Sequence, residues 1–241
     1  DGRMLRANWP IIAAAGGTSQ PVAVLPSWAH LVGARRTQPP ARDPVAYVAS
    51  APAFGERGQF APVAARPSVS PSLGKARLRV DSVRSDLVTR ESITQGLERA
   101  RVGMLVTHGT TPQNLRGSLS TFLDRTYVAL SGANTDPTAR LTATDFARLD
   151  LRGLQLLLLV ACRMADGAVV EGQGMLGFPL ALSAAGAPTS LVSVWPAPND
   201  SSTTMLVESF MRGVAEESRS FDDALRNAQD VVRRKYPEPK Y

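Results

Sequence analysis

The chain has 241 residues, 44% of them hydrophobic, so it can bury a large core and disorder is excluded as its main state. Its single cysteine excludes a disulfide-stapled scaffold and a zinc site built from several cysteines. The formal net charge of +6 arises in residues 1–101, which hold 14 Lys and Arg against 7 Asp and Glu.

The positive charge consists of scattered arginines with few aromatic residues among them, whereas a nucleic-acid surface needs a clustered basic patch. We therefore expect no direct binding to nucleic acid, and we interpret the excess as a solvated face or a docking surface. The longest uncharged apolar stretch, residues 154–162, is too short for a membrane-spanning helix, which needs about 20 residues.

Short apolar runs alternate with helical patterns along the whole chain, which predicts one layered α/β domain over residues 1–241 with a mostly parallel sheet. We expect strands at residues 22–25, 45–49, 78–80, 102–107, 154–161 and 190–194. We expect helices after Ser27, around Ile93 and Leu97, within 122–130, at 142–149 and 174–185, after Ser201 or Ser202, and over 221–232. Residues 50–75 are rich in proline and glycine, which predicts a long loop.

A histidine and the cysteine occupy matching positions at the ends of two predicted strands. His108 follows the apolar run 102–107, and Cys162 follows the run 154–161. Ligands bind at the carboxyl edge of open α/β sheets, so neighbouring strands would bring imidazole and thiol together. The histidine can then help to form a nucleophilic thiolate, and the Gly109 and Cys162 amides can form an oxyanion hole. The alternative is that Cys162 is a small core residue and His108 a structural histidine.

Two other patterns compete with this pair. Residues 172–177 read G-x-G-x-x-G, but a dinucleotide site needs the pattern directly after a strand and an acidic residue about 20 positions later, and residues 190–198 contain none. We expect these glycines to turn the chain and to pack a helix closely. His30, beside Trp28, has no second candidate ligand nearby, so we expect a surface or interhelical position.

Several short motifs, in order and spacing, resemble the CHAT peptidases, a caspase-like family related to separase and often attached to tetratricopeptide repeats. They are D-G-R-M-L at 1–5 with Trp9-Pro10, L-P-S at 25–27 with Leu31, T-H-G at 107–109, L-T-A-T-D at 141–145, A-C at 161–162, G-M-L-G at 174–177, A-G-A at 185–187, V-W at 194–195 with Asp200, and A-L-R at 224–226 with A-Q at 228–229.

The resemblance implies a caspase-like three-layer α/β/α sandwich with a mostly parallel central sheet. It implies a cysteine endopeptidase with His108 as base, Cys162 as nucleophile, and the Gly109 and Cys162 amides as oxyanion donors. Asp200 matches an acid of the S1 pocket in separase-like relatives, which implies a preference for basic P1 residues. The alternative is that Asp200 caps the helix that starts near Ser202. The substrate-binding residues expected beside Asp200 are Thr107, Ala161, Arg163 and Trp195.

The chain also departs from the family pattern. Arg163 and Met164 replace small or acidic residues after the cysteine, and the final helix leads into Y-P-E-P-K-Y rather than a W-x-x-F strand. The alternative is therefore a catalytically inactive module that binds a partner protein. We expect a cytoplasmic fragment of a longer chain, with a repeat or sensor domain before Asp1, a protein or peptide substrate, no membrane partner, and no metal or other cofactor.

Overall fold

The structure is a computed structural model, and it describes residues 43–51, 54, 58–64, 67–112, 117–162, 164, 169–170, 174–193, 198–217 and 219–237. These residues form two compact units. The described residues between 43 and 63 and between 80 and 193 form the larger unit, and those between 64 and 79 and between 198 and 237 form the smaller one. Within the described part of the chain, no helix is both long enough and apolar enough to cross a bilayer.

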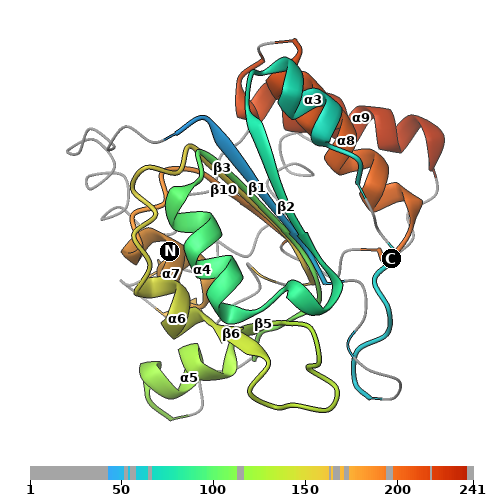
Figure 1. Ribbon diagram of the computed structural model, residues 1–241. Coiled ribbons are helices and arrows are strands. Elements are labelled where there is room, and N and C mark those ends of the chain that lie inside the picture. The colour runs from blue at the N-terminus through green and yellow to red at the C-terminus, as the bar shows by residue number, and fades with distance from the viewer. Residues whose placement is uncertain are drawn as a thin grey trace. The chain divides into compact units, whose positions relative to one another are not determined.

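A five-stranded sheet forms the centre of the larger unit, in the order β10-β7-β3-β1-β2 (Figure 1). The strands are β1 (Val45–Ser50), β2 (Arg79–Arg84), β3 (Val102–Val106), β7 (Leu156–Val160) and β10 (Ser190–Val192). Neighbouring strands from β10 through β7 and β3 to β1 pair in parallel. Helices flank this sheet, which confirms the predicted α/β class with a mostly parallel central sheet.

The middle strands of this parallel sheet are apolar on both faces, as is typical of strands that are covered on both sides. The Leu residues of β7 are at most 2% exposed, and the last four residues of β3 are all buried. Helix α4 (Arg90–Arg99) lies in front of the sheet in Figure 1 and buries Ile93 and Leu97. Thr89 and Ser92 form a capping box that fixes where this helix begins.

A second, three-stranded sheet lies in the long crossover between β3 and β7. It consists of β4 (Gly109–Thr110), β5 (Tyr127–Ala129) and β6 (Arg140–Thr142), paired antiparallel in that order. Helices α5 (Leu119–Arg125) and α6 (Ala143–Ala147) come from the same crossover, and α7 (Phe178–Ala184) packs against α6 through Phe146 and Phe178. The crossover therefore builds structure directly beside the end of β3.

The smaller unit consists of the helices α3 (Ser70–Lys75), α8 (Ser201–Ala215) and α9 (Phe221–Lys235). Helix α8 buries Val207, Phe210 and Met211. Glu216, just after α8, accepts hydrogen bonds from Ser72 at 2.7 Å and Lys75 at 2.5 Å of α3.

The structure corrects several sequence-based boundaries. Residues 70–75 form α3 rather than part of a loop, because a proline is tolerated in the first helical turn. The helix expected within 122–130 ends at Arg125, and residues 127–129 form a strand. The helix expected at 174–185 begins only at Phe178, since Gly174 belongs to the short strand β9 (Gly174–Met175), which pairs with β8 (Val169–Val170).

Candidate active site

His108 and Cys162 follow the two central neighbouring strands at equivalent positions. Val106 of β3 is paired with Val160 of β7, and the Thr107 amide continues the ladder by donating to the Val160 carbonyl at 3.1 Å. His108 and Cys162 each lie two residues beyond this last pair. The expected neighbourhood of the two strands is therefore present, and both residues leave the sheet at its carboxyl edge.

The imidazole of His108 lies against an aromatic pair from the segment after β1. Its ring stacks on Phe60, with centroids 5.5 Å apart and planes 19° apart, and it contacts Phe54 at 5.1 Å. Nε2 lies 2.6 Å from the Ala61 carbonyl oxygen. Because a carbonyl only accepts hydrogen bonds, Nε2 carries the proton in this contact, and Nδ1 of the neutral ring keeps the basic lone pair.

Asn134 holds that aromatic segment in place. Its side-chain amide donates to the Phe60 carbonyl at 2.9 Å and accepts from the Phe60 amide at 2.9 Å. Its own backbone amide donates to the Phe54 carbonyl at 2.9 Å. Gly58 permits this approach, because a Cβ there would lie 2.4 Å from the Asn134 side chain and its φ is +155°. Asn134 thus holds the backbone of both residues whose rings contact His108.

Strand β5 fixes the backbone on either side of the imidazole. The Ala129 amide donates to the His108 carbonyl at 2.9 Å, and the buried Thr107 hydroxyl donates to the Ala129 carbonyl at 2.5 Å. The Thr107 side chain, which was expected to bind substrate, makes this structural contact in the present structure.

Gly109 is glycine because of close packing and not because of a left-handed backbone. A Cβ at this position would lie 2.0 Å from the Met164 methyl carbon and 3.2 Å from the Cys162 carbonyl oxygen. Gly109 pairs with Val128, and the flanking bond from Ala129 to His108 makes this a non-hydrogen-bonded pair. In such a pair, the amide of Gly109 points away from β5.

The peptide group before Cys162 is held by a residue that follows β10, the other neighbour of β7. Ser193, which follows β10, donates its hydroxyl to the carbonyl of Ala161. Ala161 is 2% exposed, so its side chain is buried. Cys162 itself is partly exposed.

Of the remaining residues expected to bind substrate, the structure describes only Asp200. Asp200 is the N-cap of α8: its carboxylate accepts from the Ser202 amide at 2.7 Å and from the Ser202 hydroxyl at 2.5 Å. An aspartate at this position stabilises the start of the helix, because its carboxylate accepts a hydrogen bond from a backbone amide that has no partner within the helix. Arg163 and Trp195, like His30, lie outside the described residues.

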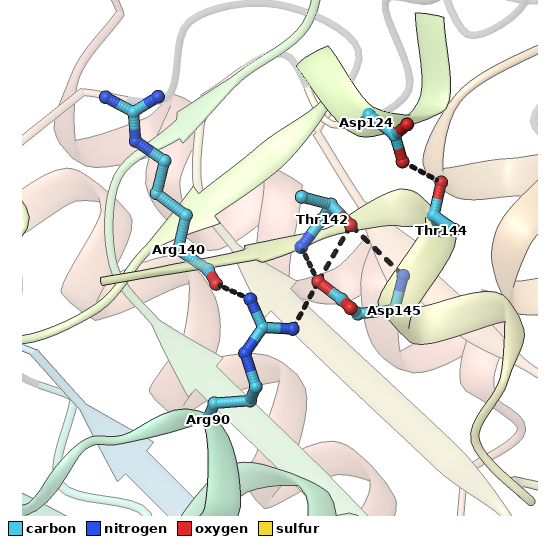
Figure 2. Close-up of polar contacts among 6 residues, drawn as sticks. All are labelled: Arg90, Asp124, Arg140, Thr142, Thr144 and Asp145. Atoms are coloured by element: carbon cyan, nitrogen blue, oxygen red, sulfur yellow. Dashed lines mark hydrogen bonds and ion pairs between the residues drawn. The ribbon is translucent and has the colours of Figure 1, made fainter. Parts of the chain in front are cut away.

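The L-T-A-T-D motif forms a structural cluster, shown in Figure 2. Thr142 and Asp145 form the capping box of α6, and Arg90 at the start of α4 pairs with Asp145 at 2.5 Å and donates to the Arg140 carbonyl at 2.7 Å. Burial alone raises the pKa of Asp145, but the hydrogen bonds from Arg90 and Thr142 outweigh it and lower that pKa. This motif therefore ties α4 to the crossover sheet.

The sequence did not predict four residues that contact or support the candidate site. They are Phe54, Phe60, Asn134 and Ser193. Phe54 and Phe60 lie in a proline-rich stretch without periodicity, and the hydrogen bonds of Asn134 span 74 residues to Phe60. Among the residues described, no three His, Cys, Asp or Glu side chains group to hold a metal ion.

The sequence was compared with family models and with curated proteins. A family model described as CHAT domain matches residues 17–240 of the chain. No curated protein matches the sequence.

Proposed function

Because the chain belongs to the CHAT domain family, a caspase-like family of peptidases, we propose that it is a cysteine endopeptidase that uses His108 and Cys162 to cleave a protein substrate. The observation that carries the proposal is the register of β3 and β7, which ends both strands two residues before these side chains. A base and a thiol on adjacent parallel strands are the groups that nucleophilic acyl transfer requires.

The hydrogen bond to Ala61 supports a defined role for each ring nitrogen. With Nε2–H donating to the Ala61 carbonyl, Nδ1 accepts the proton of the Cys162 thiol. The thiolate sulfur attacks the scissile carbonyl carbon, and the carbonyl electrons move to oxygen. When this intermediate collapses, the carbon–nitrogen bond breaks and Nδ1–H protonates the leaving amine. Water then hydrolyses the thioester, with Nδ1 again as base, and restores the thiol.

The amides of Gly109 and Cys162 are the proposed oxyanion donors. The outward direction of the Gly109 amide, away from β5, supports this role, as does the approach of Gly109 to the Cys162 carbonyl. Donors fixed before the reaction stabilise the developing negative charge without reorganisation.

We further propose control by a neighbouring repeat or sensor domain and a preference for Arg or Lys at P1, as the resemblance implies. In this proposal, the carboxylate of Asp200 binds the basic P1 side chain through a charge-assisted contact. A positional-scanning peptide library read by mass spectrometry tests this: preference for Asp at P1 would overturn it.

The test of the activity uses a peptidyl acyloxymethyl ketone on the wild-type chain and on Cys162→Ala and His108→Ala variants. We expect labelling of the wild type at Cys162, the only cysteine of the chain, and loss of labelling in both variants. The competing proposal, an inactive module that binds a partner protein, predicts no labelling under any condition. Cleavage by Cys162→Ala at the wild-type rate would refute the endopeptidase.

A further inference from the structure

We infer that Ser193 is a positioning residue for the oxyanion hole: its hydroxyl orients the Ala161–Cys162 peptide so that the Cys162 amide faces the histidine side of the site. The inference rests on the proposed function and assigns a role to a residue in neither the histidine nor the cysteine motif. Its starting point is the hydrogen bond from the Ser193 hydroxyl to the Ala161 carbonyl.

The carbonyl that Ser193 binds belongs to the same peptide group as the Cys162 amide. In a trans peptide, the C=O and N–H bonds point in opposite directions, and the described residues contain no cis peptide. A donor that fixes the Ala161 oxygen on one side therefore fixes the Cys162 N–H on the opposite side.

The order of the strands says which side this is. Strand β7 lies between β10 and β3 in the sheet, and Ser193 directly follows β10. The Ala161 carbonyl thus points toward the β10 side, and the Cys162 amide points toward the β3 side, where His108 and Gly109 follow that strand. The close approach of Gly109 to the Cys162 carbonyl agrees with this arrangement.

The Ser193 hydrogen bond matters because the regular pairing of β7 with its neighbours ends at Val160. The Ala161 amide donates to the Leu159 carbonyl at 3.1 Å, so the chain turns immediately after the strand. Beyond such a turn, strand pairing no longer sets the orientation of the next peptide, and a side-chain donor takes over this task. Ser193 is partly buried, which shields the bond from competing water.

The experiment compares Ser193→Ala with Ser193→Thr, which keeps a hydroxyl, and with Ser190→Ala, an exposed serine on β10. Two rates are measured on the full chain. One is turnover of the peptide that the wild type cleaves fastest in the library. The other is alkylation of Cys162 by iodoacetamide, a displacement at a saturated carbon that generates no oxyanion.

We expect Ser193→Ala to lower kcat by about 10- to 100-fold, because loss of a whole oxyanion donor costs about 10²–10³. We expect KM and the alkylation rate to change less than about threefold, and Ser193→Thr and Ser190→Ala to stay near the wild type. Unchanged turnover in Ser193→Ala would overturn the inference. An equal fall of turnover and alkylation would overturn it as well, since that pattern indicates a general structural role.

A second measurement does not depend on turnover. In the ¹³C,¹⁵N-labelled chain, we expect Ser193→Ala to shift the Ala161 carbonyl and Cys162 amide resonances, and Ser193→Thr to leave them near their wild-type positions. Absence of both shifts would refute the orientation itself. If Ser193→Ala shows the shifts but the wild-type chain neither cleaves peptides nor reacts with the ketone probe, the peptidase is refuted, and with it the catalytic part of this inference.

Discussion

His108 and Cys162 are fixed by different means. The histidine is held through its ring, by Phe54, Phe60 and the Ala61 carbonyl, and Asn134 holds the backbone of Phe54 and Phe60. The cysteine is oriented through the peptide before it, which Ser193 binds. The position of the proposed base therefore depends on the packing of distant side chains, whereas that of the proposed nucleophile depends on backbone direction. Variants on the two sides should have different kinetic signatures.

Removing the proposed base or the proposed nucleophile should have the largest effect, because either change stops the reaction. We expect Cys162→Ala and His108→Ala each to lower kcat/KM by about 10⁴-fold or more, as in other enzymes whose groups act as a unit. The double variant should be little worse than either single one. Measurement on the best library peptide checks this, with circular dichroism as the control for folding. Additive losses would contradict a dyad.

Gly109 directly follows His108 and lies close to the Cys162 carbonyl, so Gly109→Ala should disturb the surroundings of both residues. The new Cβ would meet the buried Met164 methyl and the Cys162 carbonyl. We expect a loss of about 1–3 kcal/mol in the free energy of unfolding from overpacking, with activity reduced by at least about tenfold.

A double variant separates the two collisions at Gly109. Adding Met164→Ala removes the clash with the flexible thioether but not the 3.2 Å contact with the backbone oxygen. Denaturant unfolding should show partial recovery of stability relative to Gly109→Ala, while the turnover stays low. Full recovery of turnover would show that the carbonyl contact is unimportant.

Loosening the histidine side alone should slow thiolate formation as well as turnover. Asn134→Ala removes both side-chain hydrogen bonds to Phe60, and we expect kcat and the iodoacetamide rate to fall together by about tenfold, below the 10²–10⁴ that a positioned base contributes. Thr135→Ala, an exposed position in the same turn, is the matched control. A fall in turnover alone would contradict the contrast with Ser193→Ala.

The smallest effect is expected from the Arg90–Asp145 pair, which touches neither side directly. Because Arg90 is 48% exposed, Arg90→Gln should cost only about 0.5–1 kcal/mol of stability and leave kcat near the wild-type value. Arg84→Gln, at an exposed position of β2, is the control.

The same pair has a defined dependence on pH. The pKa of Asp145 is lower in the folded chain than its unfolded value of about 3.9. Its contribution to stability is therefore complete above that unfolded value and is lost as the pH falls through the folded pKa. The stabilities of the wild type and Asp145→Asn, measured by unfolding at each pH, should begin to converge as the pH falls below about 4. A constant difference down to about pH 2 would contradict this.

The sequence predicted the sheet and the facing strand ends because both depend on patterns that are local in the chain. Continuous apolar runs identify β3 and β7, and a polar residue after each run identifies the candidate chemistry. Asn134 and Ser193 escaped prediction because their partners, Phe60 and Ala161, lie 74 and 32 residues away. Strand β5 escaped as well, because its few residues continue an apolar pattern that starts in α5.

The crossover between β3 and β7 also bears on when, during folding, the proposed base and nucleophile would come together. His108 lies at the start of this crossover and Cys162 follows β7, so local folding around either residue leaves it without the other. The proposed base and nucleophile would come together only after a non-local parallel pairing that closes about 50 residues of chain, which is a slow kind of step in folding. The proposed peptidase activity would then appear in one late step of folding. It would be lost as soon as β3 and β7 separate.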